Sequence, residues 1–272
     1  MKTIWTHSLV KNEERYLWFS VVSVINFVDK VLIWDTGSTD KTVEIITQLQ
    51  KIYPHKIELK EIGIVDEKGL SGARQKMLEE SDCDWILILD GDEVWWQDSI
   101  KRVVATILYK GDKLDSIVTP YINLIGDIYH HQEERAGRYQ IDGRVGHLTI
   151  RAINKNIQGL HVEKPYGEEG YFDSEGTPIQ ERLGKGRGFI NASYMHFSHL
   201  KRGRGESEVI GRIKKRRYEM GEAIPLDYFY PEVFFQLRPK NIPSPWVGMD
   251  KKYYWLARLI TPIKKIKRRL FR

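Results

Sequence analysis

The sequence predicts an α/β fold in which a mostly parallel central sheet is covered by helices on both faces. In the first 110 residues, short apolar runs alternate with segments whose apolar residues recur at helical spacing. Nearly continuous apolar runs are typical of strands that are buried on both sides, as strands of parallel sheets are. After about residue 115 the pattern changes to strands and turns, which predicts a small antiparallel layer.

The first part of the chain should hold strands and helices in strict alternation. Leu17, Val21, Val24 and Val28 show the helical spacing in one segment, and a Ser/Thr/Asp cluster precedes another as a cap. In sheets of this kind, ligands bind at the carboxyl ends of the parallel strands. The expected strands are residues 3–10, 30–35, 56–62 and 84–90, and the expected helices are residues 12–27, 37–53 and 69–81.

Composition limits the class of protein. The single cysteine, Cys83, permits no intramolecular disulfide and fits a reducing compartment. There is no apolar stretch of membrane-spanning length in the sequence. Nine of the 43 Lys and Arg residues follow Asp250 and no acid does, so the remaining 34 face all 37 acids. The body is therefore slightly acidic, which argues against a nucleic-acid partner.

Residues 251–272 form a basic tail with an amphipathic pattern. Trp255 and two tyrosines stand near its start, and Pro262 should break or restart the helix. A basic amphipathic helix with aromatic residues predicts docking of residues 253–272 on an anionic membrane surface, with packing against the protein body as the alternative. The expected location is cytoplasmic, on the inner face of the membrane. The apolar positions are Leu256, Leu259, Ile260, Ile263, Ile266 and Leu270.

Polar clusters follow three of the predicted strands, at residues 11–14, 35–38 and 90–93. These clusters should converge on one edge of the sheet and form a pocket there. Asp90 and Asp92 flank Gly91, and carboxylates at this spacing suit a divalent cation that prefers oxygen ligands. The alternative is a loop whose acids face water.

Four segments in order resemble family 2 glycosyltransferases of the GT-A fold. They are "LVKNEERYL", "VLIWDTGSTDKTVEI", "GARQKML" and "WILILDGDE", all within the first 93 residues. The resemblance to the subgroup that elaborates bacterial surface polysaccharides and lipopolysaccharides is close. The resemblance covers about the first 120 residues closely and implies a Rossmann-like half that binds a nucleotide-sugar, with a UDP-sugar favoured.

The resemblance also implies roles for particular residues. Asp35 would bind the nucleobase, although a turn or helix cap is its structural alternative. Asp90 would lie near the ribose, and Asp92 would bind Mn²⁺ or Mg²⁺ at the diphosphate. The family usually has Asn where this chain has Gln75. The donor-binding residues implied are His7, Leu9, Glu13, Asp35, Arg74 and Asp90.

An inverting transfer needs a base that takes the proton of the acceptor hydroxyl. The related subgroup often carries a His-Glu pair near "GLHVEKPYG", where Val162 here separates His161 from Glu163. Glu163 is the predicted catalytic base. The other candidates are Glu168, Glu169, Glu133 and Asp142.

The segment "MHFSHLKRGRG" holds two further candidate metal ligands. GT-A enzymes often place a late histidine on the metal, which points to His196 or His199. In one strand these two positions face opposite sides, so at most one should enter the cleft. Lys201, Arg202 and Arg204 follow, and we expect a solvated loop, with contact to diphosphate oxygens as the alternative.

The sequence thus predicts an inverting, metal-dependent glycosyltransferase that acts on a hydroxyl of a glycan or lipid-linked acceptor. Residues 1–112 would bind the donor, 113–250 would form the acceptor side of one domain, and 251–272 would be the tail. The alternatives are a nucleotidyltransferase on a similar fold and a catalytically inactive, membrane-associated protein that binds nucleotide-sugars. The sequence does not contain the glycine-rich phosphate loop G-x-x-x-x-G-K-[ST], which argues against a P-loop ATPase.

Overall fold

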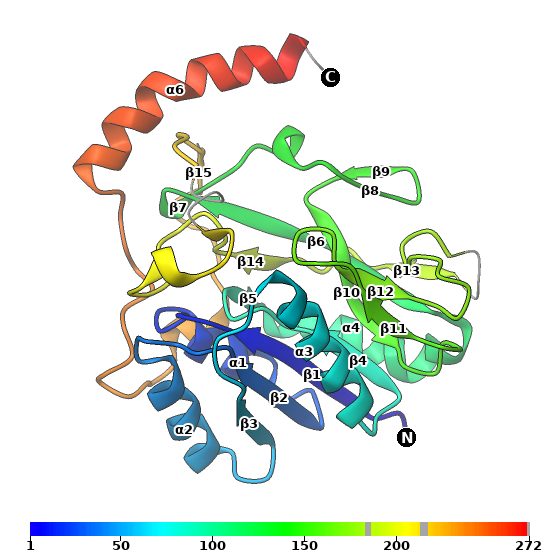
Figure 1. The fold of residues 1–272 in the computed structure, drawn as a ribbon. Coiled ribbons are helices and arrows are strands. Elements are labelled where there is room, and N and C mark those ends of the chain that lie inside the picture. The colour runs from blue at the N-terminus through cyan, green and yellow to red at the C-terminus, as the bar shows by residue number, and fades with distance from the viewer. Residues whose placement is uncertain (183–185, 213–216, 271–272) are drawn as a thin grey trace.

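A central sheet with a parallel half and an antiparallel half organises the computed structural model, which describes residues 1–182, 186–212 and 217–270 (Figure 1). The order along its main path is β15-β7-β6-β10-β4-β1-β2-β3. Strands β4, β1, β2 and β3 are parallel, whereas β10 and β6 continue the sheet through antiparallel pairs. The predicted α/β class with a mostly parallel donor-side sheet and an antiparallel layer is confirmed.

The elements of the first half are β1 (Ile4–Val10), α1 (Leu17–Val24), β2 (Lys30–Asp35), α2 (Thr42–Ile52), β3 (Ile57–Glu61), α3 (Glu67–Glu80), β4 (Trp85–Ile88), β5 (Glu93–Trp95) and α4 (Gln97–Lys110). The later strands are β6 (Ser116–Ile125), β7 (Asp127–His131), β8 (Tyr139–Ile141), β9 (Arg144–Gly146), β10 (Leu148–Asn154), β11 (His161–Glu163), β12 (Gly170–Phe172), β13 (Arg187–Phe189), β14 (Tyr194–His196) and β15 (Glu222–Ala223).

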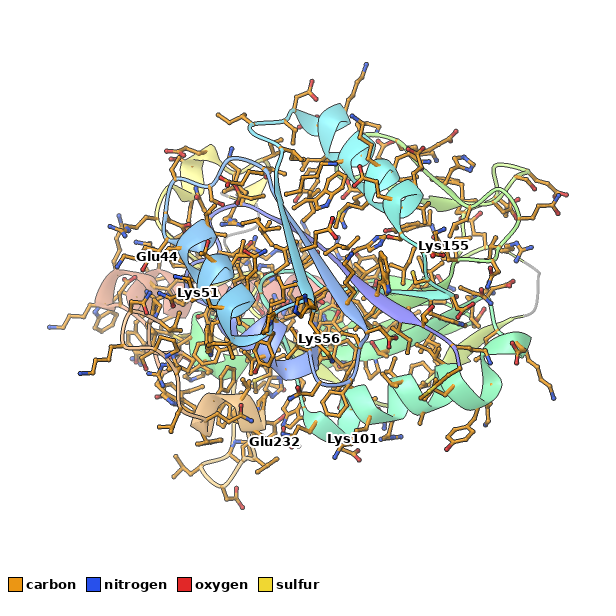
Figure 2. The ribbon with its side chains drawn as sticks, turned by 90° about the horizontal axis from the view of Figure 1, so that it is seen from below. Glu44, Lys51, Lys56, Lys101, Lys155 and Glu232 are labelled. Carbon is orange, nitrogen blue, oxygen red and sulfur yellow. The ribbon has the colours of Figure 1, made fainter. Side chains whose placement is uncertain are left out.

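Strand β2 shows how helices come to cover both faces of the sheet. Val31 and Ile33 belong to the large core that α1, α2 and α4 share, whereas Leu32 and Trp34 pack with Ala73 of α3 on the other face. Side chains alternate along a strand, so a continuous apolar run needs apolar cover on both sides. The outer surfaces of the helices carry charge into solvent, as Figure 2 shows at α2 and α4 for Glu44, Lys51 and Lys101.

The second half of the chain adds the pairings that complete the cleft. Strand β14 lies between β5 and β6, antiparallel to the first and parallel to the second. The register sets His196 directly opposite Glu93. A short hairpin of β11 and β12 packs on α3, with Val162 and Tyr171 buried beside Leu78. Residues from both halves therefore meet beyond the carboxyl end of β4.

Helix α6 (Lys251–Leu270) runs without a break through Pro262, so the expected interruption at this proline is wrong. Thr261 fits the helix by donating a hydrogen bond from its hydroxyl to the Ala257 carbonyl at 2.6 Å. Helix α6 lies along the edge of the molecule near β7 and β15 (Figure 1). The final residues of the predicted tail, 271–272, lie outside the described part of the chain.

Two opposite faces of α6 meet different surroundings. Tyr253, Ala257 and Thr261 are buried against the body of the protein. Further along the same face of the helix, Lys264 and Arg268 pair with the buried carboxylate of Glu219. The other face exposes a row of large apolar side chains, each more than half exposed. They are Trp255, Leu259, Ile263, Ile266 and Leu270. Among the described residues, there is no helix with the length and apolar character needed to cross a membrane.

Candidate active site

A cleft of about 520 Å³ opens at the carboxyl ends of β1 and β4. Its walls come from the loops after these strands, from α3, from β10 and from the segment after β14. The polar side chains that line it are dominated by carboxylates and guanidinium groups. They include Glu13, Arg74, Asp90, Asp92, Arg151, Glu169, His196, Arg202 and Arg212.

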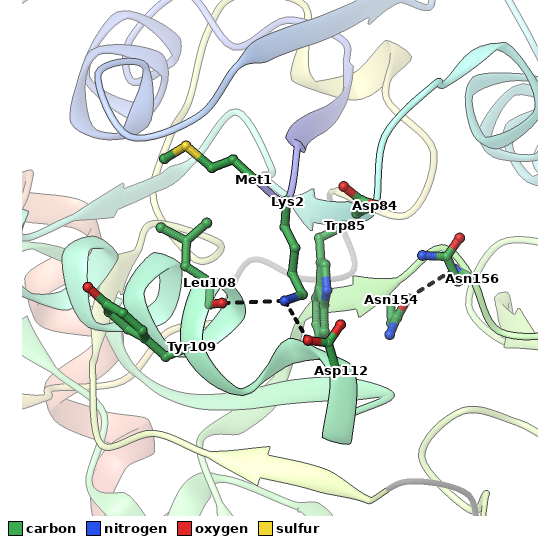
Figure 3. A pocket seen from close by; sticks show the side chains of 9 residues that line it. All are labelled: Met1, Lys2, Asp84, Trp85, Leu108, Tyr109, Asp112, Asn154 and Asn156. Atoms are coloured by element: carbon green, nitrogen blue, oxygen red, sulfur yellow. Dashed lines mark hydrogen bonds and ion pairs between the residues drawn. The ribbon is translucent and has the colours of Figure 1, made fainter.

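A second cavity, of about 510 Å³, lies at the opposite end of β1 and β4 and differs in character (Figure 3). Its lysine, Lys2, already donates to the Leu108 carbonyl and to the Asp112 carboxylate, at 3.3 and 2.9 Å. In parallel sheets, ligands bind at the carboxyl ends of the strands. The cleft at the other end is therefore the candidate active site.

The segment from Asp90 to Glu93 places three acids around one close backbone approach. A Cβ atom at Gly91 would lie 2.8 Å from the Cγ atom of Glu13. Glycine at this position therefore allows the Asp-Gly-Asp loop to pass directly over the Glu13 side chain. Four carboxylates from the ends of β1 and β4 come together in this way.

Arg151, which points from β10 into the cleft, neutralises two of these acids. Its Nη2 atom donates to Glu93 and lies 3.4 Å from Asp90, while its Nε atom donates to the Tyr194 hydroxyl at 2.8 Å. Glu93 is fully buried, and burial raises its pKa well above the ordinary value although Arg151 opposes the shift. Glu93 and Arg151 form the buried floor of the site.

Asp92 faces a different arginine and a histidine. The Nη1 atom of Arg202 lies 2.8 Å from Asp92 Oδ2, and the Nε2 atom of His196 lies 3.5 Å from the same oxygen. Burial disfavours the charged form of Asp92, but nearby positive charge, above all that of Arg202, outweighs burial and lowers its pKa. Burial lowers the pKa of His196 to about 4, so its ring is neutral near pH 7.

Glu13 joins the two arginines of the late segment. Its Oε1 atom lies 3.0 Å from Arg202 Nη1 and accepts a hydrogen bond from Arg212. Burial raises the pKa of Glu13 to about 7 against the opposing effect of both arginines. Arg212 also donates to the Asn12 and Lys11 carbonyls, which fixes it over the loop after β1.

The donor set fits a divalent cation. One ligand atom each from Asp90, Glu93 and His196 lies within 4.8 Å of the others. Both oxygens of Asp92 are buried and accept no hydrogen bond of good geometry from any described residue. Buried carboxylate oxygens without donors are costly unless a cation or water satisfies them, and neutral imidazole beside carboxylates is a suitable set for Mn²⁺.

The predicted donor-binding residues do not all lie in the cleft. Leu9, Glu13, Arg74 and Asp90 line it, and Arg74 Nη2 lies 3.7 Å from Asp90 Oδ1. Asp35 instead accepts hydrogen bonds from the backbone of Gly37 and Ser38 in its own turn. These hydrogen bonds fit the alternative role for Asp35, in which its side chain stabilises a turn.

His7 lies within β1 and is not among the described residues that line the cleft. Its Nε2 atom lies 2.7 Å from the Ser81 hydroxyl at the end of α3, and the side chain is buried. The cleft-lining side chain of β1 nearest to it is Leu9, two residues further along the strand.

The acceptor-side candidates are also separated by the structure. Glu163 is on the outer face of β11, with its side chain 55% exposed and its Oε1 atom 3.4 Å from His161. Val162 is the residue of β11 that lines the cleft. Glu169 lines it too, held by the Gly167 amide at 2.8 Å and lying 3.9 Å from Arg74 Nε. These positions argue against Glu163 as the base.

His196 and His199 occupy different surroundings. His196 lines the cleft beside Asp92, whereas His199 is buried beyond the end of β14 and is not part of the cleft wall formed by the described residues. The expected solvated loop is wrong for Arg202, which is buried, and fits Arg204, whose side chain is 67% exposed.

Sequence reasoning missed Arg151, Arg212 and the role of Glu93. Arg151 interrupts the apolar run "LTIRAI", and a lone charge in a buried strand is a usable signal because it demands a partner. Arg212 gave no such signal, since it stands among many bases in a polar segment.

An α/β sheet with a cleft at the carboxyl ends of its parallel strands belongs to the class of folds that bind ligands at that edge. The family model described as glycosyl transferase family 2 matches residues 9–163. An uncharacterized glycosyltransferase of Rickettsia typhi is 32% identical over 218 residues, which are 68% of this chain and 70% of that protein. The chain belongs to glycosyl transferase family 2 and is a glycosyltransferase.

Some other similar proteins are less identical in sequence. The glycosyltransferase SunS of Bacillus subtilis is 27% identical over 149 residues, covering 53% of this chain and only 32% of SunS. A structure of residues 1–349 of Staphylococcus aureus TarS has a TM-score of 0.43 at 15% identity, over 72% of this chain and 60% of that one. Glucosyl-3-phosphoglycerate synthase of Mycobacterium tuberculosis has a TM-score of 0.48 at 16% identity, over 79% and 77%.

His7 should make the protein sensitive to acid. Burial, with Arg74 and Lys155 adding to it, lowers the pKa of His7 from 6.5 to about 3. Between these values the unfolded chain takes up a proton that the folded protein does not, so stability is lost as the pH falls below 6.5. Near pH 5 the unfolding free energy therefore falls by roughly 1.4 kcal/mol for each pH unit that the pH is lowered.

We expect His7→Gln to reduce the pH slope of the unfolding free energy by about this amount between roughly pH 4 and pH 6. Urea unfolding at several pH values measures the slope. His55→Asn, at an exposed position with positive φ, is the control and should keep the wild-type slope. An unchanged slope in His7→Gln would show that His7 is not held neutral by burial.

Proposed function

We propose that the protein is an inverting, metal-dependent glycosyltransferase that moves a sugar from a nucleotide-sugar to a hydroxyl group. The observation that carries this proposal is the buried Asp92, whose oxygens accept no hydrogen bond of good geometry from a described residue and whose neighbours are His196 and the Arg202 guanidinium. Family membership supports the transfer of a sugar, and the family pattern favours a UDP-sugar as donor. The acceptor is a glycan or a lipid-linked glycan.

In this proposal Asp90, Asp92 and His196 hold Mn²⁺ or Mg²⁺. The bound cation supplies Lewis-acid stabilisation of the negative charge that develops on the leaving nucleoside diphosphate. His196 is neutral near pH 7, so its ring nitrogen is available as a ligand. Arg74, between Asp90 and Glu169, presents a guanidinium to the donor side of the cleft.

We assign the base to Glu169. An inverting displacement needs a carboxylate in the cleft that takes the proton of the attacking hydroxyl. Glu169 lines the cleft, and the Gly167 amide fixes one of its oxygens. Of the other candidates, Glu168 and Glu163 are exposed, Asp142 pairs with Arg187, and Glu133 pairs with Arg268 of α6.

The chain then divides by role. Residues 1–112 bind the donor, residues 113–250 complete the acceptor side, and residues 251–272 attach the protein to an anionic membrane surface on the cytoplasmic side. The attachment is supported by the exposed apolar row on α6 and by a tail that has nine bases and no acid. A lipid-linked acceptor would lie in the same membrane.

Asp92→Asn should lower the release of nucleoside diphosphate by roughly 100-fold or more, because it removes a charged ligand of the cation. The assay incubates a panel of nucleotide-sugars with Mn²⁺ or Mg²⁺, and water takes the place of the acceptor. A circular dichroism spectrum like that of the wild type is the folding control. Release of pyrophosphate from a nucleoside triphosphate and a sugar phosphate would favour a nucleotidyltransferase instead. No turnover of any donor would favour an inactive binding protein.

Glu169→Gln should lower the same turnover by roughly 100-fold while the affinity for the donor changes little, since a base acts on the nucleophile. Glu163→Gln is the matched control, six residues away on the outer face of β11, and should keep wild-type turnover. Donor affinity from calorimetry separates the two effects. Loss of turnover in Glu163→Gln with retention in Glu169→Gln would reverse the assignment.

Membrane attachment should depend on the apolar row of α6. Leu259→Glu combined with Ile263→Glu should reduce co-sedimentation with vesicles containing phosphatidylglycerol by about tenfold, because two apolar contacts are lost and two negative charges are added. Ile52→Glu makes the same kind of change at an exposed position of α2 and is the control. Equal binding of the double variant and the control would exclude this surface.

A further inference from the structure

Two buried arginines of the segment after β14 face the carboxylates of the candidate active site. We propose that Arg202 and Arg212 bind the diphosphate of the donor, and that before the donor arrives Arg202 takes the place of a cation at Asp92. The protein would therefore bind a divalent cation and a nucleoside diphosphate together and bind either alone weakly. This inference rests on the proposed function.

The positions of the two arginines carry the first part of the inference. Arg202 and Arg212 are 8% and 6% exposed, and both line the cleft. One nitrogen of Arg202 lies 2.8 Å from Asp92 and 3.0 Å from Glu13, and Arg212 donates to the same oxygen of Glu13. The carboxylate expected to hold the metal thus already has a cationic neighbour from the protein itself.

Buried polar atoms without hydrogen bonds, on the arginines and on the carboxylates that face them, indicate that a ligand binds between them. The Nε atoms of Arg202 and Arg212 are buried and donate no hydrogen bond to any described residue, and Glu13 Oε2 and Asp92 Oδ1 accept none. Asp92 Oδ2 has Arg202 as an ion-pair partner at 2.8 Å, without a hydrogen bond of good geometry. Buried polar groups normally find partners, so such a concentration points to a ligand. Guanidinium groups suit the several oxygens of a diphosphate, and carboxylate oxygens suit a divalent cation.

Charge balance links the two ligands. A cation that approaches Asp92 must displace Arg202, and the displaced guanidinium then lacks a buried counter-charge. A diphosphate provides that counter-charge, and its own charge is in turn balanced by the cation. Each ligand removes the cost of binding the other, which is positive coupling between two sites.

The exchange needs only side-chain movement. The Arg202 carbonyl accepts a hydrogen bond from the Arg15 amide, and the Arg202 amide donates to Glu206, each at 2.9 Å. The backbone on both sides of the guanidinium is therefore anchored to the loop after β1 and within its own turn. A rotation about the long side chain of Arg202 suffices to release Asp92.

The test measures Mn²⁺ binding, by the paramagnetic resonance signal of free Mn²⁺, with and without uridine diphosphate. In the wild type we expect each ligand to tighten the other by at least about tenfold and by the same factor. In Arg202→Gln, Mn²⁺ alone should bind at least about tenfold tighter than in the wild type, and uridine diphosphate should bind more weakly. Arg204→Gln removes the same charge two residues away, where the side chain is exposed and pairs with Glu14, and should match the wild type.

The outcomes distinguish this inference from the proposed function. The role of Arg202 would be overturned if Arg202→Gln bound Mn²⁺ alone with the same affinity as the wild type. It would also be overturned if the wild type bound the two ligands independently. Either result would leave a metal-dependent transferase intact. The wild-type measurement needs no variant, so it decides the matter even if Arg202→Gln fails to fold. Failure of the wild type to bind Mn²⁺ and uridine diphosphate in any combination would overturn the proposed function and this inference with it.

Discussion

The burial of several carboxylates in one cleft is the constraint on which the rest of the structure depends. An uncompensated buried charge costs several kcal/mol, and removing one partner of such a pair typically costs about 3–5 kcal/mol. The compensating guanidinium groups come from three parts of the chain, namely α3, β10 and the segment after β14, so the acids hold those parts together. Five carboxylates and four arginines form two sets of ion pairs, and His196 lies between the sets, 3.5 Å from Asp92 and 3.9 Å from Glu93. One set is Asp90, Glu93 and Glu169 with Arg74 and Arg151, and the other is Glu13 and Asp92 with Arg202 and Arg212.

Local patterns made the parallel half of the fold predictable, because the periodicity of β1 to β4 and their helices lies within a few neighbouring residues. The same locality explains why Leu9, Glu13, Arg74, Asp90 and Asp92 were placed correctly at strand and helix ends lining the cleft. Their assigned chemical roles remain proposals.

The arginine partners were out of reach of such reasoning. The pair between Glu13 and Arg212 joins residues 199 positions apart, and only the tertiary fold brings them together. The role of Asp35 stays a prediction: an aspartate before Thr-Gly-Ser accepts hydrogen bonds in its own turn, and a sequence pattern does not distinguish this from a ligand contact. The prediction for Glu163 depended on the register of β11, because a shift of one residue moves a side chain to the opposite face of the strand.

The anchor of α6 and the cleft share one path of hydrogen bonds. Glu219, which holds Arg268 and Lys264, accepts from Gln132 at 3.4 Å, and Gln132 accepts from Asn123 at 2.8 Å. Asn123 in turn accepts from Ser198, which lines the cleft two residues after His196. Asn123 lies in β6, directly opposite His196 of β14. These contacts connect the anchored face of α6 to the wall of the cleft. Under the proposed function, the surface that binds the apolar row of α6 would therefore also set the direction from which an acceptor reaches Glu169.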